Sequence, residues 1–523
     1  MNVVLDPTSR SVTAAPPTPA AGSRLAVGPA AAPVLAVALM LGWAAEGLFY
    51  GRALGVSVPL FVLLLLAALF GLGRLAKSPS ASRYSLWLLP PLLFLAAMAA
   101  VRASAPLTAL NLLGAAGLLG LVAFFHRGVR SGIERLPLLG YAAALGLIGA
   151  DALTAAAAPA AALTRRAVGR GRRSTLVVPL ARGGLLALPI VLVFALLLAS
   201  ADTVFALRLE SLLRLGFLSD LPELLGRTAI ALAVAWLCAG GLLGALRPPG
   251  SDDGLPGRLA PGRRIGAVEA AVVLGALDLL FAGFVWIQVR YLFGGVARLT
   301  MDYEAYREYV RRGFGELLLA AFLAMTLILW LRWIGRGDAR TLRTLASLTI
   351  VLVGVILASA YWRMVIWEDV EYYISTPLRL FVRWSIVWLG VAFAWLLVTL
   401  WTRPERFPIG AFAALVGFVV TMNVIDPDAA VAAHNLRRND ELSVRFVDLL
   451  SDDAVPALAA GLDTTTGETR ARLRAHLAGR LAHLEVTRQA DDAPGYWGGW
   501  PSWHLARLRA YAVLSELRRQ GRI

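Results

Sequence analysis

Apolar stretches of membrane-spanning length dominate the chain from about residue 33 to about residue 425. Each is about 17 to 25 residues long, the length of helix that crosses roughly 30 Å of hydrocarbon. Lipid offers no hydrogen-bond partners to the backbone, so each stretch has to satisfy its own N–H and C=O groups as a helix. We therefore predict an all-α polytopic membrane protein with about 11 to 12 transmembrane helices. The predicted spans are residues 33–50, 53–73, 84–101, 107–125, 184–206, 228–246, 265–289, 317–333, 345–361, 380–400 and 408–425.

Composition and charge support a membrane class. The hydrophobic fraction is 58% and the charged fraction 16%, whereas about a quarter of the residues of soluble proteins are charged. The formal net charge of +16 is carried mainly by arginines in the loops between apolar stretches. We assign this charge to orientation against anionic lipid and exclude nucleic acid as a partner. The single cysteine, Cys238, excludes a disulfide framework.

The chain divides into four predicted regions. Residues 1–31 form a disordered Ala/Pro-rich tail, residues 32–180 the N-terminal membrane helices, residues 181–425 a membrane core and residues 426–523 a soluble helical C-terminal region. In that last region, Ser451 followed by Asp452 and Asp453 is typical of a helix start. One apolar helix face is predicted from the spacing of Leu473, Leu477, Leu481 and Leu484.

The apolar segment 137–164 differs from the others. It contains Asp151 and Pro159, and both of its flanking loops are rich in arginine. A single crossing would put these two basic loops on opposite sides of the membrane, against the positive-inside tendency. We therefore predict that this segment does not cross. The amino terminus is then cytoplasmic and the tail after residue 425 external.

Two carboxylates within apolar runs are candidate functional groups. A lone charge at the position of Asp278 costs roughly 2.5–3.5 kcal/mol on insertion scales, so this group must be neutral, paired or facing a cavity. Its functional interpretation is a proton- or ion-coupling carboxylate, and its alternative is a helix-to-helix hydrogen bond. Asp202 lies near a predicted helix end, where a structural cap is the favoured interpretation.

Two polar and aromatic patches between spans are candidates for a binding lip. The first carries Gln288, Arg290, Tyr303, Tyr306 and Arg312, and the second carries Arg363 and Glu368. On the predicted topology both patches face the same compartment, where they either pair electrostatically or form one vestibule. The alternative is an amphipathic surface helix whose tyrosines form an interfacial belt.

Signatures of soluble enzymes are absent from the sequence: it has no P-loop, HExxH or GxSxG motif. His476 and His483 are seven residues apart, about 10 Å along a helix, which is too far to share one ion. We expect no cofactor and no metal, and we do not expect an enzyme.

Several longer motifs carry a family resemblance. They include FVWIQVRYLFGG, RMVIWEDVEYY, NVIDPDAAVAAHN, VDLLSDDAVPAL and PSWHLARLRAY. In these the chain resembles a family of bacterial multi-pass membrane proteins known as a domain of unknown function, numbered 4153 and 4173, from about residue 184 to residue 511. The resemblance implies a bacterial inner-membrane location, and it brings no catalytic residues with it.

Two functions remain open from the sequence. A permease-like transporter requires Asp278 to face a polar pathway. An envelope sensor, signalling or assembly protein instead binds a protein partner through the outward loops and the C-terminal region. A third and weaker alternative is an envelope-lipid or glycan transferase that uses the loops around Arg312 and Glu368.

Overall fold

The computed structural model describes ten segments of the chain. These are residues 31–76, 83–127, 136–162, 221–247, 265–288, 314–334, 339–370, 375–438, 447–489 and 495–523. Within them the secondary structure is helical and contains no β-strand, and an isolated bridge joins Arg52 to Tyr496. Ten helices in these segments are long and apolar enough to cross a membrane. The prediction of an all-α polytopic membrane protein is therefore confirmed.

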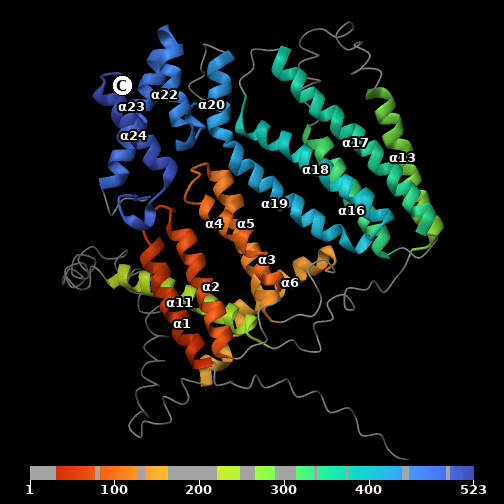
Figure 1. The fold of residues 1–523 in the computed structure, drawn as a ribbon, viewed down its shortest axis with the longest axis horizontal. Coiled ribbons are helices and arrows are strands. Elements are labelled where there is room, and N and C mark those ends of the chain that lie inside the picture. Colours follow the sequence, from red (N-terminus) through yellow and green to blue (C-terminus); the bar gives the residue numbers. More distant parts are fainter. Residues whose placement is uncertain are drawn as a thin grey trace, which may run out of the picture.

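The N-terminal half forms a first bundle (Figure 1). Its helices are α1 (Ala31–Phe49), α2 (Ser57–Leu75), α3 (Arg83–Trp87), α4 (Leu89–Met98), α5 (Ala105–His126), α6 (Leu138–Thr154) and α11 (Leu221–Ala245). The predicted span 84–101 is divided into α3 and α4, because Pro90 and Pro91 lack the N–H groups that would continue α3. The predicted span 184–206 lies outside the described residues.

Helices α1 and α11 pack antiparallel at close range. A side chain at Gly42 would clash with the backbone carbonyl of Ala231, and Ala38 packs with Ala239. Near the other end, Arg227 Nε donates to Glu46 Oε1 at 2.5 Å. Small residues thus allow the backbones to approach, as is common between membrane helices.

A second bundle follows in the chain. It contains α13 (Ala267–Gln288), α16 (Phe314–Ile334), α17 (Ala339–Val370) and α18 (Pro377–Trp401). Helix α19 (Phe407–Ile425) lies between the bundles. Its residue Val419 belongs to the first core, while Phe407 and Ala414 belong to the second. Helix α19 therefore joins the two apolar cores.

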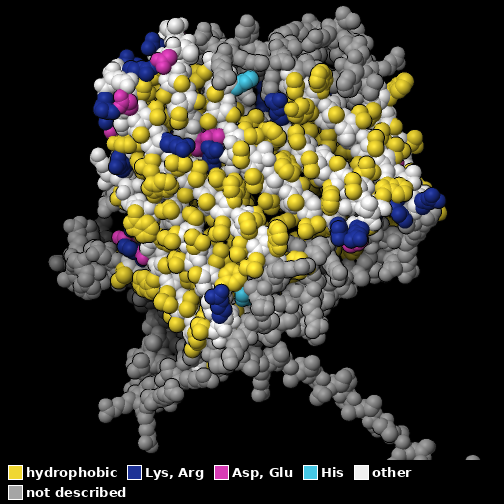
Figure 2. Space-filling view, in the orientation of Figure 1, with side chains coloured by type: hydrophobic (Ala, Val, Ile, Leu, Met, Phe, Trp, Pro, Cys, Tyr) yellow, Lys and Arg dark blue, Asp and Glu magenta, His cyan; other side chains and the backbone are white. Residues whose placement is uncertain are grey.

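The C-terminal region has a core of its own. Its elements are α20 (Pro427–Arg438), η4 (Asp452–Ala454), α22 (Val455–Thr464), α23 (Gly467–Gln489), η5 (Trp500–Ser502) and α24 (Leu505–Arg519). The four leucines predicted to form one face of α23 are all buried. Charged side chains gather over this region, whereas apolar side chains cover most of the membrane helices in view (Figure 2).

The C-terminal region is docked on one end of the first bundle. Two backbone bonds reach the loop between α1 and α2: Ala53 N donates to Tyr496 O at 2.9 Å, and Val56 N donates to Trp503 O at 2.9 Å. A third runs from Leu505 N to Ala100 O, in the loop between α4 and α5, at 2.9 Å. We call this end of the bundle the docking end and the opposite end, where α1 begins, the far end.

Helix α6 packs against the far-end portions of its neighbours. Asp151 forms ion pairs with Arg127, just after α5, and with Arg247, just after α11. Nearer its start, the Tyr141 ring stacks on Phe412, close to the beginning of α19, with 5.8 Å between ring centroids. Both halves of α6 thus contact far-end portions of other helices, and by length and apolarity Leu138–Ala162 is one of the ten helices that could cross a membrane.

Candidate functional site

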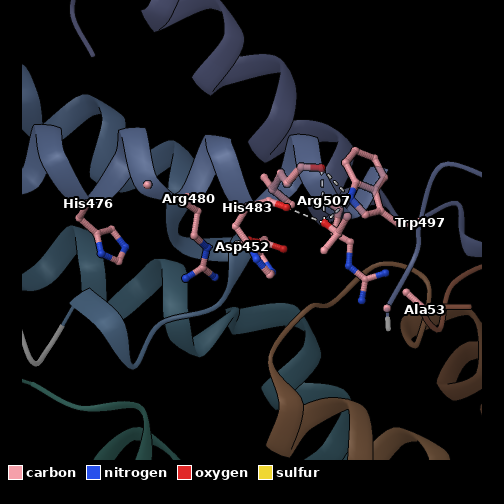
Figure 3. A pocket seen from close by; sticks show the side chains of 11 residues that line it. Ala53, Asp452, His476, Arg480, His483, Trp497 and Arg507 are labelled. Carbon is pink, nitrogen blue, oxygen red and sulfur yellow. Dashed lines mark hydrogen bonds and ion pairs between the residues drawn. The ribbon is translucent and has the colours of Figure 1, made fainter. Parts of the chain in front are cut away.

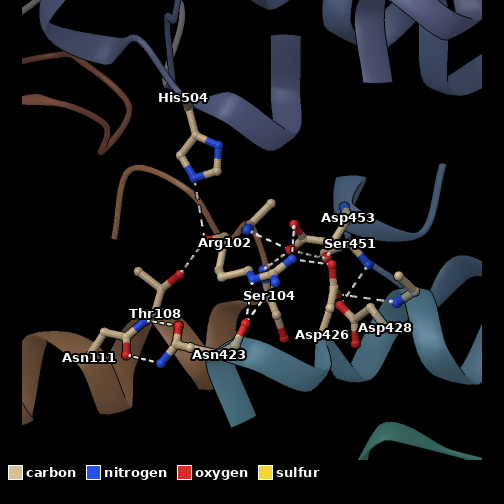
Figure 4. Close-up of polar contacts among 12 residues, drawn as sticks. Arg102, Ser104, Thr108, Asn111, Asn423, Asp426, Asp428, Ser451, Asp453 and His504 are labelled. Carbon is tan, nitrogen blue, oxygen red and sulfur yellow. Dashed lines mark hydrogen bonds and ion pairs between the residues drawn. The ribbon is translucent and has the colours of Figure 1, made fainter. Parts of the chain in front are cut away.

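Arg102 is the centre of a partly buried polar cluster where the C-terminal region meets the membrane helices (Figure 4). It lies in the loop between α4 and α5. Its Nε and Nη2 atoms donate to the backbone oxygen of Asn423, at 2.9 and 2.6 Å. Its Nη1 atom forms an ion pair with Asp426 and lies 3.8 Å from Asp453 Oδ1. One guanidinium thus contacts the end of α19 and the start of η4.

Asp426 occupies the turn that makes this contact possible. Its φ of 56° is the one left-handed non-glycine backbone in the described residues, a conformation that aspartate adopts more readily than most residues. The turn ends α19, and Pro427 begins α20 directly after it. Asp426 Oδ1 also accepts from Ala429 N at 3.3 Å, which caps α20. Burial raises the pKa of the Asp426 carboxyl.

Asp453 binds the backbone directly before a helix in another part of the chain. Its Oδ2 atom accepts from the backbone N–H groups of Ala103 at 2.6 Å and Ser104 at 3.2 Å, at the start of α5. A carboxylate at a helix N-terminus is electrostatically favourable. Burial, followed by the nearby charge of Asp426, raises the pKa of Asp453 to about 6.

Two further contacts extend the cluster. Asn111 of α5 and Asn423 of α19 exchange side-chain hydrogen bonds of 2.9 and 2.6 Å inside the bundle. His504, which precedes α24, lies 3.3 Å from the Arg102 backbone oxygen through Nε2. Burial, followed by the charge of Arg507, lowers the pKa of His504 to about 4. The cluster therefore joins two membrane helices to two separate segments of the C-terminal region.

Three of the residues predicted from the membrane half lie at or near the contact between α13 and α17. Thr349 Oγ1 donates to Asp278 Oδ1 at 2.6 Å, and Ser359 Oγ donates to Gln288 Oε1 at 2.5 Å. Arg363, one turn after Ser359, is also buried. Asp278 Oδ2 is buried without a hydrogen-bond partner among the described residues. The helix-to-helix bond that was the alternative interpretation of Asp278 is present.

The other predicted site residues are not positioned by the structure. Glu368 belongs to α17, but its side-chain surroundings are not described. Asp202, Arg290, Tyr303, Tyr306 and Arg312 lie outside the described residues. The predicted vestibule between the two aromatic patches therefore stays a prediction.

The Arg102 cluster was not predicted from the sequence. A single arginine between two apolar spans is indistinguishable from an ordinary loop charge. A usable signal lay in the family motifs, because three of them, at residues 423–435, 447–458 and 501–511, meet at this cluster. Each supplies an acid, amide or imidazole to the contact.

Together, the fold and the cluster are those of a multi-pass helical membrane protein whose C-terminal helical region is fastened to one end of the bundle by buried charges. The chain belongs to the family described as Domain of unknown function (DUF4153), whose model matches residues 89–461. The match begins at residue 89 rather than at 184, and it ends at 461 rather than at 511. It includes Arg102, Asp426 and Asp453. No curated protein and no solved structure matches the chain.

Proposed function

We propose that the protein is a membrane sensor whose C-terminal region recognises a ligand or partner and communicates its state to the helices. The observation that carries this proposal is the Arg102 cluster. Its central guanidinium contacts the end of α19 and the start of η4, while Asp453 binds the backbone directly before α5. A shift of the C-terminal region would therefore disturb the ends of two membrane helices directly.

The same cluster favours a signalling role for the C-terminal region over a role as a domain that is merely linked to the helices. A flexible tether needs no buried ion pairs, and removing one partner from such a network costs several kcal/mol. Helix α19 also joins the two apolar cores. A change at its end can thus reach both bundles through packed side chains.

We further propose that the docking end faces the outside of a bacterial plasma membrane. The arginine-rich segments 127–135 and 247–264 adjoin helix ends at the far end, as the ends of α5 and α11 indicate. The positive-inside tendency assigns that end to the cytoplasm. The C-terminal region is then exposed to the envelope, where a sensor would meet its partner.

Hydrogen–deuterium exchange of the full chain in nanodiscs tests the coupling. Arg102→Gln removes the charge that Asp426 and Asp453 share, and because the Arg102–Asp426 pair is partly buried, we expect a loss of about 1–3 kcal/mol. We expect faster exchange both in η4 and α22 and in the adjoining ends of α5 and α19. Arg403→Gln, an exposed arginine at the far end, is the matched control and should change neither. An effect of Arg102→Gln confined to the C-terminal region would contradict the proposal.

A permease remains a second candidate because of one observation: the Oδ2 atom of buried Asp278 has no hydrogen-bond partner within the described segments. Asp278→Asn keeps an oxygen that can accept from Thr349, so the fold should survive. Proton uptake into proteoliposomes, driven by a pH gradient, is the measurement. A coupling role requires that the variant lose this flux completely, whereas equal flux in the two proteins would reduce Asp278 to a helix-packing residue.

A further inference from the structure

A second feature of the docking end is a cavity of about 650 Å³ between α23 and the loop that joins α1 to α2 (Figure 3). One wall is a single face of α23, with His476, Arg480, His483 and Thr487. The rest of the lining includes Ala53, Asp452, Trp497 and Arg507. Asp452 is the neighbour of Asp453 in the chain, so the cavity adjoins the Arg102 cluster.

The charged groups of this lining leave one cation in excess. Arg480 Nε donates to Asp452 Oδ1 at 2.9 Å, and this pair is largely self-compensating. The other guanidinium, Arg507, donates through Nη1 to the Leu54 backbone oxygen at 3.1 Å. That carbonyl is the one hydrogen-bond partner of Arg507 in the described part of the chain. The remaining N–H groups of Arg507 are therefore available to an acceptor in the cavity.

Burial of Arg507 strengthens its attraction for an anion. Desolvation lowers the pKa of its guanidinium, and the nearby Asp452 carboxylate only partly opposes this. Even so, arginine keeps its charge at any physiological pH. A partly desolvated cation without a counter-ion of its own gains more from an incoming anion than an exposed one does.

The other polar groups suit the same kind of ligand. The His483 ring has no partner among the described residues and extends from α23 beside Asp452 and Arg480. Trp497 is held in place, because its Nε1 donates to Leu484 O at 3.1 Å and to Thr487 Oγ1 at 3.2 Å. His476 Nδ1 is already paired with Asp448 Oδ1 at 2.9 Å, so the two arginines and His483 are the groups that favour an anionic ligand.

The cavity lies at the level where lipid headgroups are expected. Ala53, in its lining, is between the end of α1 at Phe49 and the start of α2 at Ser57. Trp500 and Trp503, from the adjacent η5 segment, are 66% and 45% exposed. Tryptophan is enriched at the membrane interface. A side chain at Gly55 would clash with Trp503 O, so glycine lets η5 approach this loop closely.

We propose that this cavity binds a phosphate group, with Arg507 as its principal contact and His483 as a second donor. An anionic phospholipid headgroup is the source that the interfacial position favours, and a soluble phosphate ester is the other source of the same chemistry. This inference rests on the proposed function and names the ligand that the C-terminal region recognises.

Native mass spectrometry of the full chain tests the site with three probes. These are short-chain phosphatidylglycerol, glycerol phosphate, and dioctanoylglycerol as an acyl-chain control without phosphate. We expect phosphatidylglycerol to bind and Arg507→Gln to weaken it roughly tenfold or more, as the loss of a charge-assisted hydrogen bond requires. Arg509→Gln, an exposed arginine on the same helix, should leave binding unchanged. Binding of glycerol phosphate with the same Arg507 dependence would support a soluble ligand at this site.

Two further variants keep the test informative if Arg507→Gln misfolds. Asp452→Asn removes the carboxylate of the lining, so we expect tighter binding, by roughly fivefold for one partly screened charge. His483→Gln alters an exposed side chain and should weaken binding without lowering thermal stability. The proposal is overturned if neither phosphate compound binds, if dioctanoylglycerol binds equally well, or if these variants leave affinity unchanged.

The phosphate site and the proposed function can fail separately. If no phosphate compound binds while Arg102→Gln still changes hydrogen exchange on both sides of the cluster, the phosphate site is contradicted. The proposed coupling between the C-terminal region and the helices is then still supported. If phosphatidylglycerol binds but Arg102→Gln has only local effects, the site is real and the signalling proposal is contradicted.

Discussion

Two residues of the Arg102 cluster respond to pH in opposite directions. The pKa of Asp453 is raised from 3.8 to about 6, so the folded state binds its proton more strongly than the unfolded state. Its contribution to stability therefore rises as pH falls from about 6 to about 4. The pKa of His504 is lowered from 6.5 to about 4. Its contribution is lost over the range in which that of Asp453 is gained.

Removing either group should separate the two effects. We expect His504→Gln to gain about 2 kcal/mol of stability at the cluster relative to the unmodified protein between pH 6.5 and pH 5. Asp453→Asn should lose stability relative to the unmodified protein as pH falls through about 6, because it cannot take up the proton. Both changes in stability can be measured by hydrogen exchange, as the protection of the Ala103 and Ser104 amides corrected for intrinsic exchange. Parallel pH profiles in the two variants would show that these pKa shifts do not govern the junction.

The position of helix α6 bears on the topology of the membrane helices. Helix α5 ends at the far end, whereas α11, antiparallel to α1, begins at the docking end. Both halves of α6 contact far-end portions of other helices. Leu138–Ala162 is by length and apolarity one of the ten helices that could cross a membrane, but these contacts favour the prediction that it lies across the far end.

Reporter fusions test this inference. A fusion after Phe125 and one after Arg173 should report the same compartment, and a fusion after Ile425 should report the opposite one. The physical reason is that Asp151 forms ion pairs with both Arg127 and Arg247 at the far end. Opposite compartments for the first two fusions would show that α6 crosses.

Some features of the fold could be predicted from the sequence, and others could not. Length and apolarity were enough for the spans, because a membrane leaves a helix as the one local solution for each stretch. Pro90 is evident in the sequence, but the division of the predicted span 84–101 at this proline was not predicted. The bond between Asp278 and Thr349 needs the pairing of α13 with α17, which no local pattern encodes. Ala103 and Asp453 are 350 positions apart, so their contact depends on the whole fold.

For the molecule as a whole, signalling depends on the C-terminal region being fastened to the bundle. Arg52 and Tyr496 are partners in the isolated β-bridge between the two parts. Bridge partners on adjacent strands lie about 5 Å apart, within the Cα separation that a disulfide spans. The natural Cys238 can be replaced by alanine to leave a single engineered pair.

The most direct measurement is therefore the rate of disulfide formation between Arg52→Cys and Tyr496→Cys in native membranes, with and without Arg102→Gln. We predict that the crosslink forms rapidly in the Cys238→Ala background and that Arg102→Gln slows it about tenfold or more, because breaking the buried pairs frees the C-terminal region. Absence of the crosslink, or an equal rate with Arg102→Gln, would contradict a fastened C-terminal region.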